Sequence, residues 1–132
     1  MEKFVFTISF ALLIFVSKGQ SFQSLDTIKA PAGFENIYSR PLYADSLASS
    51  FVIFIKQEVK AHKHITHTEH VYILEGDGEM TLGYKKFKVK KGDVVFIPKN
   101  TPHSLKTTSA LPVKVVSLQS PMFDGRDRVF IE

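Results

Sequence analysis

The 132-residue sequence contains no cysteine. This absence excludes disulfide scaffolds, thiolate metal sites, iron–sulfur clusters and catalytic thiols. The excess of one charge sign is small as well, because 17 basic and 13 acidic residues leave a net charge of +4. Together with the lack of a helix-turn-helix pattern, this balance argues against a nucleic-acid partner. Repeats and strong helical periodicity are also missing, so the composition suits one ordinary globular domain.

The one long apolar run lies at the start of the chain. Lys3 precedes the apolar residues 4–16, and the small residues Ser17 and Gly19 follow. This order predicts a secretory signal peptide over residues 1–19, with cleavage between Gly19 and Gln20. Because a membrane span needs roughly 20 apolar residues, we expect a periplasmic or secreted protein without a stable membrane anchor. A short N-terminal anchor or a buried first strand is the alternative.

Signals for short strands follow one another along the rest of the chain. β-Branched and aromatic runs occupy residues 51–59, 71–74, 94–97 and 113–118, and residues 79–82 and 87–90 flank a glycine turn that predicts a hairpin. Residues 20–50 contain turn-forming proline and glycine, so we expect an irregular arm that contributes an outer strand. Many short strands without helices predict an all-β fold, an antiparallel sandwich or barrel.

All five histidines fall in two short segments, four of them within residues 62–70 and the fifth at His103. Residues two apart on a strand project to the same face, so His62 and His64 can direct both imidazoles at one cation. Glu69 is the nearest carboxylate. Imidazole suits Zn, Fe, Ni and Cu, and a carboxylate adds Mn to the choice. An isolated His-x-His pair is more often solvated, but its clustering with Glu69 and His103 favours a metal site.

These residues resemble the two motifs of the cupin family. The first motif runs Gly, five residues, His-x-His, three or four residues, Glu, six residues, Gly, and its last four positions match His62, His64, Glu69 and Gly76. The second runs Gly, five residues, Pro-x-Gly, two residues, His, three residues, Asn, and Gly92, Pro98 and His103 match it. The resemblance covers residues 51–118.

Three positions depart from the two motifs. Lys56 stands at the leading glycine, Asn100 at the glycine after Pro98, and Thr107 at the closing asparagine. Asparagine tolerates left-handed backbone geometry better than most residues, so Asn100 is a mild change. Lys56 and Thr107 lie at the motif edges, where they affect the lip of the pocket and leave the metal site intact.

The resemblance implies a jelly-roll cupin barrel over residues 51–120, a double-stranded β-helix of two antiparallel sheets. It also implies one divalent transition metal (Fe, Mn, Ni or Zn) bound by His62, His64, Glu69 and His103. Such a set leaves two octahedral positions for water, dioxygen or a small-molecule ligand, as in catalytic metal sites.

Two classes of function follow from this resemblance. The first is a metal-dependent enzyme acting on a small oxygenated molecule by dioxygenation, lyase chemistry or isomerisation. The second is a cupin module that binds a metal or a small ligand without turnover. A positioned acid–base group beyond the metal ligands would distinguish them, and His67, in the loop between two ligands, is the candidate catalytic residue. A solvated loop histidine is the alternative reading of His67.

Strand parity assigns the remaining histidine. A regular strand from Glu69 onward places Val71 and Ile73 on the inward face, and His70 and Tyr72 on the outward face. We therefore expect His70 at the surface or at an interface. A homodimer is an open expectation, formed through residues 24–50 or through the tail.

The tail, residues 121–132, has apolar residues on both sides of the charged stretch 124–128. A disordered terminus is usually polar throughout, so this pattern predicts a C-terminal tail docked on the barrel or on a second subunit. We expect the rings of Phe123 and Phe130 to hold it, because buried aromatic rings stabilise more than exposed ion pairs do. A solvated tail is the alternative.

Overall fold

The computed structural model describes residues 21–131. The predicted signal peptide, residues 1–19, lies outside the described residues, so export stays a prediction. The one helix in the described part is a 3-10 turn, η1 (Leu25–Thr27). No helix in this part of the chain has the length and apolar character needed to cross a membrane.

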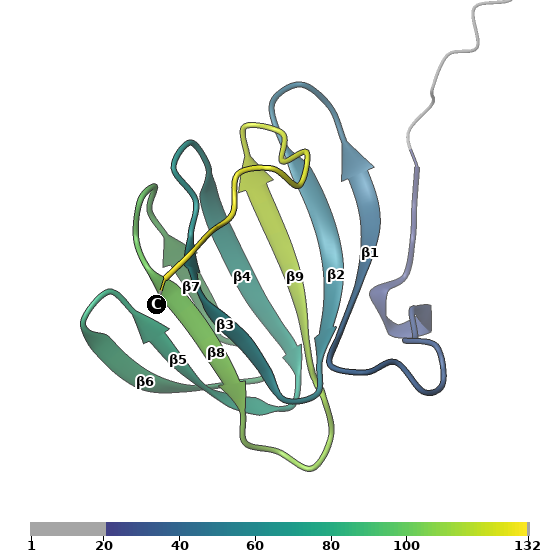
Figure 1. Ribbon diagram of the computed structural model, residues 1–132. Coiled ribbons are helices and arrows are strands. Elements are labelled where there is room, and N and C mark those ends of the chain that lie inside the picture. Colours follow the sequence, from purple (N-terminus) through teal and green to yellow (C-terminus); the bar gives the residue numbers. More distant parts are fainter. Residues whose placement is uncertain (1–20, 132) are drawn as a thin grey trace, which may run out of the picture.

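Two antiparallel sheets of five strands each make up the fold within residues 21–131 (Figure 1). Sheet 1 has the order β1-β2-β9-β4-β7, and sheet 2 has the order β10-β3-β8-β5-β6. The strands are β1 (Ile37–Ala44), β2 (Ser49–Ile55), β3 (Glu58–Lys63), β4 (Thr68–Glu75), β5 (Asp77–Leu82), β6 (Lys85–Lys90), β7 (Val94–Ile97), β8 (His103–Thr107), β9 (Val113–Ser120) and β10 (Val129–Phe130). From β2 to β5 the chain changes sheet at each strand, which confirms the predicted all-β jelly roll.

The inward faces of the two sheets enclose an aliphatic core. Its buried members are Ile55, Ile73, Met80, Val89, Val95, Ile97, Leu105, Val113 and Val115. On β4 the alternation is as predicted, because Ile73 is buried and Val71 packs against the core, whereas Tyr72 is exposed. His70 is half-buried on the outer face, where its ring lies 4.9 Å from the ring of Phe96.

The run 51–59, expected as one strand, is divided by a turn between β2 and β3. The Asn36 side chain holds this turn: its Oδ1 accepts the N–H groups of Gln57 (2.9 Å) and Glu58 (3.1 Å), and its Nδ2 donates to the Glu58 carbonyl (2.8 Å). Neither glycine nor proline marks the turn. The sequence therefore carries no local signal for it, because the stabilising partner stands 21 residues before Gln57.

A second apolar cluster lies on the outer face of sheet 1, where the arm before β1 packs. Ile28, Val52 and Phe54 are its buried members. Lys114, 1% exposed, joins the arm to the sheet: its Nζ donates to the Leu25 carbonyl (2.8 Å) and to Glu75 (3.1 Å). A lysine so deeply buried is tolerated because a carbonyl and a carboxylate accept its hydrogen bonds.

The motif positions that departed from the cupin pattern are accommodated locally. Asn100 adopts a left-handed φ of 58°, as predicted from its replacement of a glycine. The Thr107 hydroxyl donates to the Ile55 carbonyl (2.9 Å) and so links β8 to the end of β2. Lys56 lies in the Asn36-held turn without a positive φ, since Asn100 is the one non-glycine residue with positive φ among the described residues.

Gly76 generates a prediction about stability. Its φ is +78°, and a Cβ there would lie 2.9 Å from the Pro112 carbonyl oxygen. Gly76→Ala should therefore combine left-handed strain with a backbone clash and lower the free energy of unfolding by about 2–4 kcal/mol. Gly83→Ala is the matched control: Gly83 has φ +57° and open space around it, so strain alone should cost about 1 kcal/mol. Equal urea midpoints for the two variants would contradict the clash.

Candidate metal centre

His62 and His103 face each other across sheet 2. They form a register pair between β3 and β8, although Val59 pairs with Leu105 in a different register. The shift between Val59 and His62 is one residue, and without it Ala61 would stand opposite His103. A β-bulge of this kind re-aims a side chain, and here it directs the His62 imidazole into the barrel. The two rings lie 4.2 Å apart, centroid to centroid.

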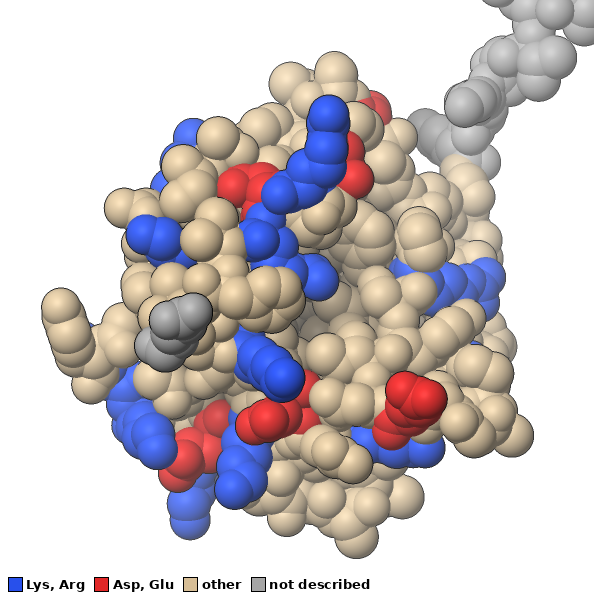
Figure 2. Space-filling model, viewed as in Figure 1, with Lys and Arg blue, Asp and Glu red and all other residues tan. Residues whose placement is uncertain are grey.

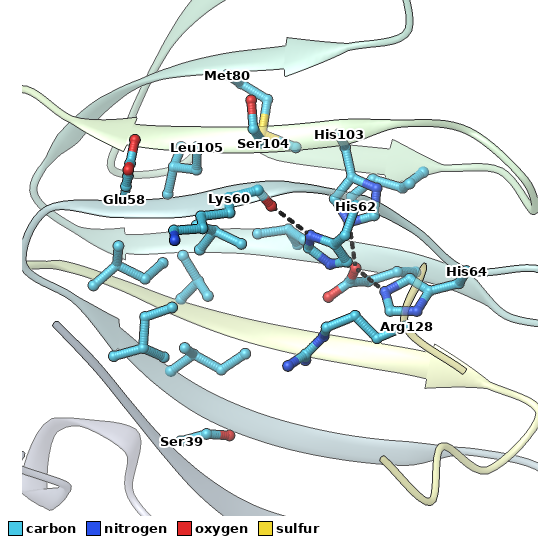
Figure 3. A pocket seen from close by; sticks show the side chains of 18 of the residues that line it. Ser39, Glu58, Lys60, His62, His64, Met80, His103, Ser104, Leu105 and Arg128 are labelled. Atoms are coloured by element: carbon cyan, nitrogen blue, oxygen red, sulfur yellow. Dashed lines mark hydrogen bonds and ion pairs between the residues drawn. The ribbon is translucent and has the colours of Figure 1, made fainter. Parts of the chain in front are cut away.

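Glu69 and His64 complete the cluster from the other side. Glu69 lies on β4 of sheet 1, and its Oε2 is 3.5 Å from the Nε2 atoms of both His64 and His103. One ring nitrogen from each of His62, His64 and His103 lies within 4.8 Å of the others. All four residues are buried, and the three imidazoles converge on one region of the cavity (Figure 3). The structure thus brings together the four residues that the sequence predicted as metal ligands.

Backbone carbonyls orient all three imidazoles. Nδ1 of His62 donates to the Lys60 carbonyl (2.8 Å), and Nδ1 of His103 donates to the Thr101 carbonyl (3.0 Å). Nδ1 of His64 donates to the carbonyl of Asp127. Because a carbonyl can only accept, each Nδ1 carries a proton, and each Nε2 presents a lone pair when the imidazole is neutral.

Hydrogen bonds from β9 hold the Glu69 carboxylate. Its Oε1 accepts from the Ser117 hydroxyl (2.5 Å) and from Gln119 Nε2 (3.4 Å), which leaves Oε2 facing the histidines. Burial raises the pKa of Glu69, but interactions with the two nearby imidazoles and with Ser117 outweigh burial and hold the pKa well below its ordinary range. The cluster therefore contains a fixed negative charge.

The histidines differ in their affinity for protons. Burial, followed by repulsion from His103, lowers the pKa of His62 to about 4. Burial also acts against protonation of His64, but the Glu69 carboxylate and the Asp127 carbonyl raise its pKa above the ordinary value. His64 Nε2 is buried and has no hydrogen-bond partner among the described residues. An unpartnered buried nitrogen aimed at a carboxylate and two imidazoles is chemically suited to a metal ion.

A cavity of about 320 Å³ opens beside the cluster. Figure 2 shows it as a hollow in the surface with basic side chains near its rim. Its walls are mostly aliphatic: Ile37, Ile53, Ile55, Val59, Val71, Ile73, Met80, Ile97, Leu105 and Val115. Glu58, Lys60 and Arg128 supply the other charges along its lining. The four clustered residues thus face a largely apolar chamber.

The tail leaves β9 and crosses toward β3, where β10 pairs with Lys63 and His62 (Figure 1). Its main attachment is the Asp127 carboxylate, which accepts from the N–H groups of Ile65 and Thr66 (both 2.8 Å) and from the Thr66 hydroxyl (2.7 Å). The expectation that two phenylalanine rings hold the tail is therefore wrong in part. The Phe123 ring does lie 5.4 Å from the ring of His64, but Phe130 is 62% exposed.

His67 also belongs to this attachment. Its Nδ1 bonds the Asp127 carboxylate (2.5 Å), and its Nε2 bonds the Met122 carbonyl (3.0 Å). Both ring nitrogens are thus engaged by the tail, and His67 is not among the described residues that line the cavity. A catalytic role for His67 stays a prediction, whereas its contacts are those of a residue that holds the tail.

The chain belongs to the cupin family, because residues 51–119 match the family model described as a cupin domain. An uncharacterised protein of Methanocaldococcus jannaschii is 39% identical over 87 residues, which cover 66% of this chain and 69% of that protein. An uncharacterised protein of Aquifex aeolicus is 40% identical over 84 residues, or 64% of this chain and 69% of its own length.

Among solved structures, KdgF from a Halomonas species is similar with a TM-score of 0.70. The similarity covers 80% of this chain and 97% of KdgF, at 19% sequence identity. At that identity the likeness shows the fold alone.

The tail attachment is testable through Asp127. Asp127→Ala removes the acceptor of several hydrogen bonds and leaves the N–H groups of Ile65 and Thr66 without their partner. The free energy of unfolding should fall by about 1–3 kcal/mol, and amide exchange at both residues should accelerate. Asp124→Ala is the control, because Asp124 is exposed and pairs with Arg126 instead, and its urea midpoint should match the parent's. Unchanged exchange in Asp127→Ala would show that the carboxylate does not hold the loop.

Proposed function

We propose that the chain binds one divalent transition metal through the Nε2 atoms of His62, His64 and His103 and the carboxylate of Glu69. The observation that carries this proposal is the buried, unpartnered Nε2 of His64, 3.5 Å from Glu69 Oε2. Three imidazoles and one carboxylate suit Fe, Mn, Ni or Zn. The carbonyl-bound Nδ1 atoms support it further, since metal-bound histidines usually donate their second nitrogen in this way.

We further propose that the site acts as a metal-dependent enzyme on a small molecule held in the cavity. A bound metal would supply Lewis-acid or oxygen-activating chemistry. The aliphatic walls offer an apolar surface to a small molecule, and Ser117 and Gln119 keep the carboxylate of Glu69 directed at the imidazoles. Binding of a small ligand without turnover is the second candidate. The engagement of both His67 nitrogens favours it, because that histidine is the acid–base group that the sequence suggested.

Elemental analysis of protein purified from its native source, combined with an oxygen-uptake assay, tests both candidates. Redox-active iron with oxygen uptake on addition of candidate substrates would select a dioxygenase. Zinc without uptake would favour lyase, isomerase or binding roles. Protein that neither retains a transition metal nor binds one on titration would contradict the proposal.

Single replacements test the ligand set. His62→Ala, His64→Ala, His103→Ala and Glu69→Gln should each weaken zinc affinity by about 10-fold or more, because each removes one donor or its charge. His70→Ala is the matched control: His70 lies on the outer face of β4, with its ring against Phe96, and its loss should leave the affinity unchanged. Calorimetric titration measures both. Equal losses from His70→Ala and His103→Ala would overturn the assignment.

The pH dependence of metal affinity follows from the two histidine shifts. A metal can bind His64 only after its second proton leaves, and the raised pKa of His64 makes protons compete with the metal at a higher pH than for an ordinary imidazole. Affinity should therefore fall as the pH is lowered through the neutral range, while His62, with a pKa of about 4, adds to the loss only near that pH and below it. Titrations at several pH values check this. A constant affinity from about pH 5.5 to 7.5 would contradict it.

A further inference from the structure

Arg128 places a positive charge in the cavity beside the histidines. It is one of the lining residues, and Figure 3 shows its guanidinium directed into the chamber near His62 and His64. The backbone that carries it is anchored on both sides. Asp127 is bound by the β3–β4 loop, and Val129 pairs with Lys63. The guanidinium thus projects from a fixed position.

Arg128 is exposed, and no hydrogen bond or ion pair joins its guanidinium to another side chain within residues 21–131, whereas Arg126 is paired with Asp124. Its Cζ lies over the Phe123 ring, 5.7 Å from the centroid, within the range of a cation–π contact. Arg126, two residues earlier, is bound by Asp124 (2.8 Å from Nε to Oδ2). An edge of parallel N–H donors matches the two oxygens of a carboxylate or a phosphate.

The charges along the cavity favour a single negative charge on the ligand. Arg128 and Lys60 are opposed by Glu58, while the Glu69 charge is directed at the histidines. The balance outside the metal centre is therefore one positive charge, which a monoanionic carboxylate complements better than a dianionic phosphate.

The walls indicate the rest of the ligand. Aliphatic side chains dominate them, and Asn36, Ser39 and Ser104 are the uncharged polar residues of the lining beyond those that hold the metal centre. A densely hydroxylated molecule would leave most of its hydroxyls without hydrogen-bond partners. Phe130, two residues after Arg128, adds an aromatic ring to the same lining.

We infer that the cavity takes a small carboxylate with an apolar body, whose carboxylate pairs with Arg128 and whose body lies along the aliphatic walls. The inference rests on the proposed function only in placing a metal beside the ligand. The contacts with Arg128 and with the aliphatic walls do not require the metal. It makes Arg128 a specificity-determining residue.

Hexanoate and hexanamide are suitable probes, since they share one shape and differ in charge. On zinc-loaded protein, hexanoate should bind about 10-fold more tightly than hexanamide, as expected for a charged bidentate pair. Arg128→Gln should lose most of this preference, and Arg128→Lys should retain part of it. Arg126→Gln is the control and should bind both probes as the parent does. Zinc affinity should survive in all three variants.

Several results would overturn the inference. These are absence of hexanoate binding by the parent, equal binding of the two probes, an undiminished preference in Arg128→Gln, and tighter binding of hexyl phosphate than of hexanoate. Repeating the titrations on metal-free protein separates this inference from the metal proposal. If the parent binds no zinc, the metal proposal fails, and the metal-free preference for hexanoate and its loss in Arg128→Gln still decide the role of Arg128.

Discussion

The structure depends most on the hydrogen bonds that allow four polar side chains to be buried between two apolar sheets. A buried imidazole or carboxylate without partners destabilises a fold by several kcal/mol. Here each histidine donates Nδ1 to a carbonyl, and Ser117 and Gln119 bind one oxygen of Glu69. These bonds engage Nδ1 of each imidazole and Oε1 of Glu69, and they leave the Nε2 atoms and Oε2 directed at a common point. The same contacts that make burial tolerable therefore also prepare the site.

One of these hydrogen bonds makes the site depend on the tail. His62 and His103 bond to carbonyls two residues earlier on their own segments, but His64 bonds to Asp127, 63 residues away. Asp127 uses its carbonyl for His64 and its carboxylate for the β3–β4 loop, and the next residue reaches into the cavity. A single short segment thus orients one of the clustered imidazoles, holds the β3–β4 loop and places a cation at the cavity. Truncations or tags at this end are best judged by their effect on the site as well as on stability.

The sequence predicted the fold class and the four clustered residues because both are written in local patterns. Strand alternation and the His-x-His spacing can be recognised without knowing which strands pair. Asn100 was also correctly expected to tolerate a left-handed backbone. The bulge that turns His62 toward His103 was not predictable, since it appears as a register shift between two strands. The hydrogen-bond acceptors of the three Nδ1 atoms could not be predicted for a similar reason. They are main-chain carbonyls, which every residue possesses, so no residue type marks them.

The tail shows a different limit of sequence reasoning. The prediction weighted aromatic burial above charge, because exposed ion pairs contribute little. Asp127 escapes that rule by facing a row of backbone N–H groups and a buried imidazole, where a carboxylate is worth more than at an exposed surface. For the Glu69 environment, by contrast, the sequence did contain a signal. Ser117 and Gln119 stand at alternate positions of the apolar strand β9, and inward-facing polar groups there require a buried polar partner. The two arginines of the tail also differ in whether a charged partner is available to them. Arg126 has a local carboxylate beside it, whereas Arg128 lines a largely aliphatic cavity and has no side-chain partner among the described residues, which is why we infer a pairing with a ligand.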